Sequence, residues 1–321
     1  MNWQTANATA MLRAPQVHRD LGIDRSGYVD VFAALRAAGI ECMAQNLSKL
    51  FGFYVGPDDD GPAVLLNASL DEVNLRHTAA HELGHHVFGH GSRADTELDI
   101  AGLQPQRQWT AVEKQAESFA AWFLMPLPAV DAALQRIGTD QVRQPEQAYE
   151  LARWLGTSYA GTVRHLRRLK KISARVATSW PQVAPQRLRA RIHRATLQRP
   201  KSHLFLLRPS ARNGLLHVAV GDLLLLPPGA RAADVPEGLV AVESVEWPSD
   251  STSAGPTDPD DTACAALEVT EQFRRSCEIV IVLADADSYP VSVMAPVRRR
   301  GADVAWGTGA DVETPTSADR D

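Results

Sequence analysis

The chain has 321 residues, of which 45% are hydrophobic and 22% charged, and its formal net charge at pH 7 is −5. This is long enough for two globular domains. Cys42, Cys264 and Cys277 are too few and too scattered for a disulfide framework or a paired-cysteine metal site. The first 20 residues lack an apolar signal core, and no run approaches the roughly 18 apolar residues of a membrane span. We therefore expect a cytoplasmic protein with no membrane contact.

The N-terminal part of the chain predicts a helix followed by a small sheet. Residues 1–24 carry only weak signals, and we expect them to be weakly structured. Tyr28, Phe32 and Leu35 then mark one helix face, which Gly39 is placed to end. Short strands are expected at 40–44, 50–55 and 63–66, the last after a turn rich in glycine, proline and aspartate.

The next segment contains the motif His81-Glu82-Leu83-Gly84-His85. Ser69 and Glu72 have capping-box spacing, so a helix should begin at Ser69 and continue through the motif. Residues four apart share a helix face, so the two histidines can bind one metal ion. Glu82 projects beside them, where its carboxylate can take a proton from an attacking water. The pattern predicts metal-assisted hydrolysis, with Zn2+ as the metal.

A catalytic zinc usually has three protein ligands, so one more must come from elsewhere. The segment 112–126 has a helical apolar stripe with Glu113 and Glu117 four residues apart on one edge. We predict Glu113 as the third ligand and Glu117 as an acceptor that orients a ligand histidine. His86 and His90 compete as third ligands, but helix geometry ranks both below Glu113.

Two flanking segments are predicted to shape the cleft. The strand at 63–66 precedes the metal helix, and an extended peptide substrate could pair with it by β-addition. A loop at 91–110 is expected to lie at the rim.

Together, HELGH, the segment from Glu113 to the Leu-Met-Pro ending at Pro126, and the helices at 148–172 resemble the ImmA/IrrE family of zinc metallopeptidases. The resemblance covers about residues 25–175. It implies a small gluzincin-like peptidase with His81, His85 and Glu113 on zinc and Glu82 as the base. The family's known substrates are helix-turn-helix repressors of the XRE type, cut in response to DNA damage or a related signal. One departure is Glu117, where the family commonly carries Asn or Asp.

A helix-turn-helix-like pattern surrounds Gly156-Thr157-Ser158. Its second helix would either enter a DNA major groove or pack against the peptidase core, and the resemblance favours packing. Tyr159 and His165 in this helix are candidates for stabilising the oxyanion of the reaction. From Arg164 to Lys201 there are twelve Lys or Arg and no acidic residue. This segment is either a solvated surface or a docking surface for nucleic acid or an acidic partner.

We therefore expect an α+β fold in which a zincin-like peptidase at 25–175 is followed by a basic linker and helix at 176–201. Residues 202–307 should form a mainly β accessory domain, because short apolar runs recur there between turns. Residues 248–261 and 308–321 are poor in apolar side chains and should be disordered.

The leading functional hypothesis is a zinc metalloendopeptidase that cleaves a repressor protein. The alternative is a DNA-binding regulator with a structural zinc, which would normally have four protein ligands. The predicted metal ligands and base, His81, Glu82, His85 and Glu113, all lie before Arg164. We therefore expect the basic segment to serve target recognition and the chain beyond Lys201 to serve regulation.

Overall fold

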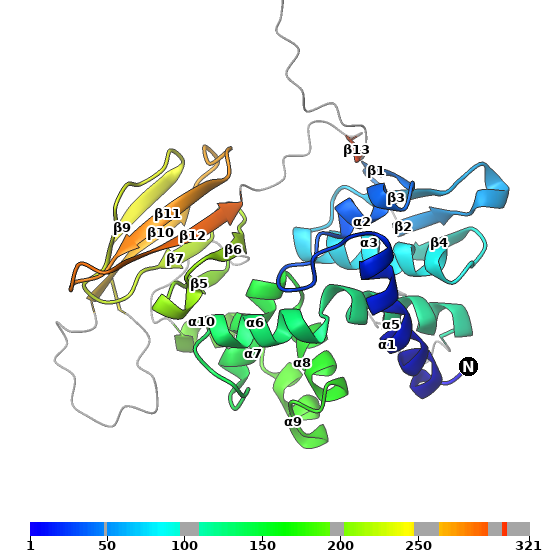
Figure 1. Cartoon of the computed structure of the whole chain (residues 1–321), viewed down its shortest axis with the longest axis horizontal. Helices are drawn as coiled ribbons and strands as arrows, with labels where there is room; N and C mark the ends of the chain where they lie inside the picture. Colours follow the sequence, from blue (N-terminus) through cyan, green and yellow to red (C-terminus); the bar gives the residue numbers. More distant parts are fainter. Residues whose placement is uncertain (48–49, 97–108, 193–201, 247–262, 295–303, 307–321) are drawn as a thin grey trace, which may run out of the picture.

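The computed structural model describes residues 1–47, 50–96, 109–192, 202–246, 263–294 and 304–306 (Figure 1). The fold is mixed α/β: an N-terminal helical region with a small sheet precedes a C-terminal region of β-sheets. In the part of the chain that is described, no helix is both long and apolar enough to cross a membrane.

The N-terminal residues form a long helix, α1 (Trp3–Asp20), so the prediction that residues 1–24 are weakly structured is wrong. The Asn2 side chain caps this helix by accepting from the backbone N–H of Thr5. The buried residues Ala6, Ala10 and Ala14 recur every four positions and pack against α5 (Ala111–Leu124). Alanines give a weak hydrophobic signal, and for this reason the sequence did not reveal the helix.

The small sheet has the strand order β13-β1-β3-β2-β4. Its strands are β1 (Glu41–Gln45), β2 (Leu50–Val55), β3 (Ala63–Asn67), β4 (Arg93–Thr96) and β13 (Val304–Trp306). The first three confirm the predicted strands. The β-addition prediction is wrong, because β3 is hydrogen-bonded to β1 on one side and to β2 on the other. A substrate strand therefore cannot pair with it.

Two helices lie close to this sheet, α2 (Val31–Ala37) and the metal-motif helix α3 (Glu72–Val87). The predicted motif helix is confirmed, but it starts later than expected. Asp71 is its N-cap and accepts from Asn74 N at 2.9 Å. Ser69 instead donates from its hydroxyl to Asn67 Oδ1 at 2.8 Å, which removes it from the capping role.

The segment after α5 is helical. It contains α6 (Leu127–Arg136), α7 (Pro145–Leu155), α8 (Tyr159–Arg168), α9 (Ala174–Ser179) and α10 (Pro185–Ile192). The predicted turn between α7 and α8 is confirmed, with Gly156 at φ +61° and Ser158 as the N-cap of α8. Much of α8 is buried against neighbouring helices, as the packing alternative predicted. α10 lies within the predicted basic linker and helix, while 193–201 lie outside the described residues.

The C-terminal region consists of two four-stranded sheets, ordered β5-β7-β10-β9 and β6-β12-β11-β8 (Figure 1). Their strands are β5 (Leu204–Leu206), β6 (Gly214–His217), β7 (Leu223–Leu225), β8 (Arg231–Ala232), β9 (Leu239–Glu246), β10 (Ala263–Val269), β11 (Cys277–Val282) and β12 (Ser288–Met294). The predicted β-rich character is thus confirmed. One assignment needs correction, because β13 pairs antiparallel with β1 of the N-terminal sheet. The predicted disordered segments 248–261 and 308–321, and most of the loop at 91–110, fall outside the described residues.

Candidate metal centre

The metal-site candidates come from two helices, α3 and α5, that pack very closely. Gly84 lies in the contact: a Cβ at this position would be 3.0 Å from Ala116 Cα. A larger residue would therefore push the helices apart. Glu113 stands in the first turn of α5, whose N-cap Thr110 accepts from the Glu113 backbone N–H. The close packing brings its carboxylate to the histidines of α3.

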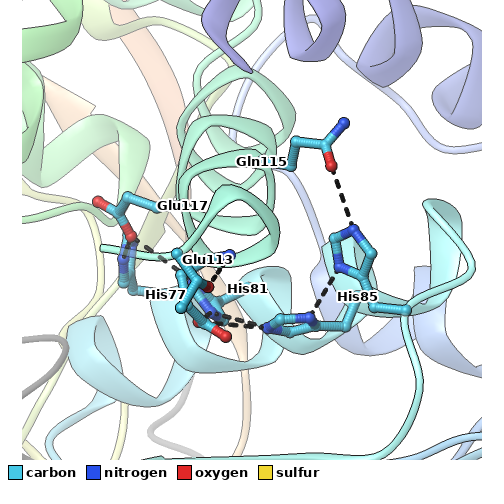
Figure 2. Close-up of polar contacts among 8 residues, drawn as sticks. His77, His81, His85, Glu113, Gln115 and Glu117 are labelled. Carbon is cyan, nitrogen blue, oxygen red and sulfur yellow. Dashed lines mark hydrogen bonds and ion pairs between the residues drawn. The ribbon is translucent and has the colours of Figure 1, made fainter. Parts of the chain in front are cut away.

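Three ligand atoms converge, as predicted for His81, His85 and Glu113 (Figure 2). The two histidine Nε2 atoms are 3.1 Å apart, and Glu113 Oε2 lies 3.2 Å from that of His81 and 3.5 Å from that of His85. Tetrahedral zinc binds nitrogen and oxygen at about 2.0–2.2 Å, which places its ligand atoms about 3.3 Å from one another. The observed triangle fits a zinc ion held by three protein atoms, and this geometry leaves one ligand position for water.

Charge in this cluster also favours a cation. Burial opposes ionisation of Glu113, but hydrogen bonding and charge from His81 and His85 outweigh it and hold the pKa of this carboxyl well below its usual range. The first turn of a helix further favours a negative charge. Glu113 is therefore an anion that faces two imidazole nitrogens.

A series of hydrogen bonds outside the triangle of candidate ligand atoms orients His85. Its Nδ1 lies 2.9 Å from His90 Nδ1, and His90 Nε2 lies 3.2 Å from Gln115 Oε1. When His85 Nε2 binds a metal, its proton is on Nδ1 and is donated to His90, which in turn donates from Nε2 to Gln115. These contacts place His90 behind His85 and outside the group of candidate ligand atoms found among the described residues. No local sequence pattern indicates the role of Gln115.

His86 has a different neighbour. Its Nδ1 lies 3.0 Å from the hydroxyl of Tyr54 on β2. Neither His86 nor His90 belongs to the convergent ligand group among the described residues. The preference for Glu113 over these two histidines is thereby supported.

Glu117 lies beside His81, but its shortest contact is with a residue that the sequence analysis did not single out. Glu117 Oε2 is 2.8 Å from His77 Nε2 and 3.7 Å from His81 Nδ1, and the second distance exceeds that of a hydrogen bond. Burial opposes ionisation of Glu117, but the charge of His77 and its hydrogen bond outweigh this and lower the pKa of the carboxyl. His77 precedes His81 by one helical turn, a spacing that could have indicated it.

Glu82 is fully buried and lies against β2. A Cβ on Gly52 would be 2.5 Å from Glu82 Oε1 and 2.6 Å from Thr78 Cγ2. Only glycine at this strand position leaves room for the carboxylate. The strand therefore fixes where the predicted base stands.

Tyr159 and His165 are both core residues. The Tyr159 hydroxyl donates to the carbonyl of Trp180 at 3.0 Å. His165 is fully buried with Nε2 2.9 Å from the Met125 carbonyl, and burial lowers the pKa of its ring to about 3. Both groups are bonded to main-chain carbonyls, which leaves the prediction that they stabilise an oxyanion without support from the structure.

The N-terminal region is similar to a family of known proteins. Residues 39–166 match the family model described as the IrrE N-terminal-like domain, Peptidase_M78. No curated protein matches the chain significantly.

Proposed function

Because residues 39–166 belong to the ImmA/IrrE metallopeptidase family, we propose that the chain is a zinc-dependent metalloendopeptidase. The observation that carries this proposal is the triangle of His81 Nε2, His85 Nε2 and Glu113 Oε2, whose sides of 3.1–3.5 Å suit tetrahedral zinc. The fold of this region is then of the zincin type.

In this proposal each residue has a separate task. His81, His85 and Glu113 hold the metal, which when bound polarises the peptide carbonyl and acidifies water. Glu82 takes a proton from the attacking water and delivers it to the leaving amine. His90 and Gln115 fix the ring of His85, so the ligand nitrogen keeps its lone pair directed at the metal.

The proposed substrate is a protein, a helix-turn-helix repressor of the XRE type. The support for this substrate is the resemblance of the motifs to the family together with the twelve cations between Arg164 and Lys201. These cations would attract an acidic or DNA-bound target, and the attraction would weaken with salt.

The rival, a DNA-binding regulator with a structural zinc, has less support. Structural zinc usually has four protein ligands, and the part of the chain that the structure describes brings together three.

The test combines metal analysis with hydrolysis of a denatured protein. We expect one zinc per chain in the wild type and in Glu82→Gln, and hydrolysis in the wild type alone. Glu82→Gln keeps all three metal ligands and removes only the base. Hydrolysis by Glu82→Gln would refute the role of Glu82. Tight zinc and DNA binding without hydrolysis by the wild type would favour the rival.

A further inference from the structure

A second, smaller site lies next to the metal-site candidates. It is a cavity of about 90 Å³, large enough for a carboxylate group. Helices α3, α5 and α8 enclose it, together with the turn before α8. The polar residues that matter in its wall are His77, Glu117, Ser158, Arg164 and Arg168.

The cavity contains more positive than negative charge. Arg164 and Arg168 are four residues apart on one face of α8, so both guanidinium groups can reach the same ligand. Neither forms an ion pair or hydrogen bond with any residue that the structure describes. Glu117 is the one carboxylate in the wall, and His77 already binds it at 2.8 Å. Two guanidinium groups that repel each other therefore face a cavity with room for another anion.

Arg168 is also partly removed from water. Burial lowers the pKa of its guanidinium, the charge of Glu117 raises it, and Arg164 lowers it. A desolvated cation is costly unless an anion accompanies it, and arginine binds carboxylates through two parallel hydrogen bonds. The cavity thus has the chemistry of a carboxylate site.

The position of the cavity connects it to the metal centre. Glu117, in its wall, lies 3.7 Å from Nδ1 of His81, while Nε2 of the same ring belongs to the metal triangle. In Figure 2, Glu117 and His77 lie on one side of His81, and His85 lies on the other side. The cavity wall therefore adjoins the ring of His81, so the part of a substrate that this cavity could receive is a side chain close to a bond held at the metal.

We propose that this cavity is a specificity pocket that binds an aspartate or glutamate side chain of the substrate close to the cleaved bond. Its occupant would accept from Arg164 and Arg168. The inference rests on the proposed peptidase function and adds a preference within it. A carboxylate suits the site better than a phosphate dianion, because Glu117 would repel the second negative charge.

The first test measures binding without hydrolysis. N-acetyl-aspartate amide is titrated into the zinc-loaded full chain, with N-acetyl-asparagine amide and inorganic phosphate as comparison probes. Side-chain NMR signals of Arg164 and Arg168 report contact, and each is assigned by its Arg→Lys variant. We expect saturable shifts with the aspartate probe alone and at least about tenfold weaker binding in Arg168→Gln, since charged hydrogen bonds are the strong ones.

Arg167→Gln is the matched control, because Arg167 is exposed on the same helix and does not line the cavity. It should bind the aspartate probe as the wild type does. Equal shifts with the aspartate and asparagine probes would overturn the proposal. Tighter binding of phosphate would also overturn it, as would binding unchanged by Arg168→Gln.

The second test maps cleavage sites in a denatured protein by mass spectrometry. The wild type and Arg167→Gln should cut at a fixed distance from an acidic residue, and Arg168→Gln should lose this preference while keeping its zinc. Probe binding without hydrolysis would support the pocket and count against the peptidase. Hydrolysis with no acidic preference and no probe binding would refute the pocket and leave the peptidase standing.

Discussion

Gly52→Ala should impair hydrolysis by displacing Glu82 while leaving the metal bound. The new Cβ would be 2.5 Å from Glu82 Oε1 and 2.6 Å from Thr78 Cγ2. Thr78 is buried and β-branched, so its side chain has little freedom to rotate. The flexible end of Glu82 must therefore yield, and relief of the contact with Thr78 needs a small shift of β2 relative to α3 as well.

The size of the displacement follows from these distances. Carbon and oxygen in ordinary van der Waals contact are about 3.5 Å apart, so the Glu82 carboxylate must move by roughly 1 Å. A misplacement of about 1 Å in a reacting group can reduce the rate about 100-fold. We expect a fall of that order in kcat and an altered acidic limb of the pH–rate profile. The stability cost should be about 1–3 kcal/mol, as for other overpacked sites.

The measurement compares kcat, zinc stoichiometry and Tm of Gly52→Ala with those of Gly91→Ala. A Cβ on Gly91 would have no neighbour within 4 Å, so this control adds the same methyl group without a clash. The reasoning is refuted if Gly52→Ala folds, binds zinc and retains the wild-type kcat. Loss of zinc would show instead that the strand supports the ligands.

Four further substitutions test the contacts around the metal. Glu113→Ala should lose zinc whereas His86→Ala should keep it, and metal analysis showing the reverse would make the assigned third ligand wrong. His90→Ala should weaken zinc affinity about 10–100-fold in a chelator competition, because His85 loses the acceptor that fixes its ring. Glu117→Ala should reduce zinc affinity or kcat by a similar factor. If Glu117→Ala behaves as the wild type in both assays, this residue has no supporting role at the metal.

The sequence predicted the candidate metal ligands because their placement is mostly local. His81 and His85 share a helix face through their spacing alone, and Glu113 lies on the edge of another apolar stripe. The sequence does not predict the distance between the two helices, α3 and α5. That distance depends on Gly84 facing Ala116, which is a contact between segments more than 30 residues apart.

Most of the features that the sequence did not predict depend on such long-range contacts. The hydrogen bond of Glu117 goes to His77, although the spacing rule had directed attention to the two ligand histidines. Likewise, β13 pairs with β1 although the two strands lie near opposite ends of the sequence, with Trp306 opposite Cys42. Turn and hydrophobicity patterns describe single segments, so they predict that a strand forms but not which strand it pairs with.

Long-range contacts also bear on the expectation that separate regions of the chain carry out catalysis and regulation. The sequence places His81, Glu82, His85 and Glu113 before Arg164, but the N-terminal and C-terminal regions share a packed contact. His217 of β6 stacks on Tyr28 with ring centroids 3.4 Å apart, and Tyr28 covers the guanidinium of Arg76 at 3.6 Å.

Arg76 belongs to the metal helix α3 and is fully buried. It donates to the carbonyls of Val29, Leu155 and Gly156, which ties α3 to the start of α2 and to the turn between α7 and α8. Removing the chain after Arg175 would uncover Tyr28 and one side of this anchor. A buried arginine holds its geometry only while its surroundings exclude water and satisfy its donors. The C-terminal region therefore packs, through His217 and Tyr28, against the buried arginine that anchors the helix carrying His81 and His85.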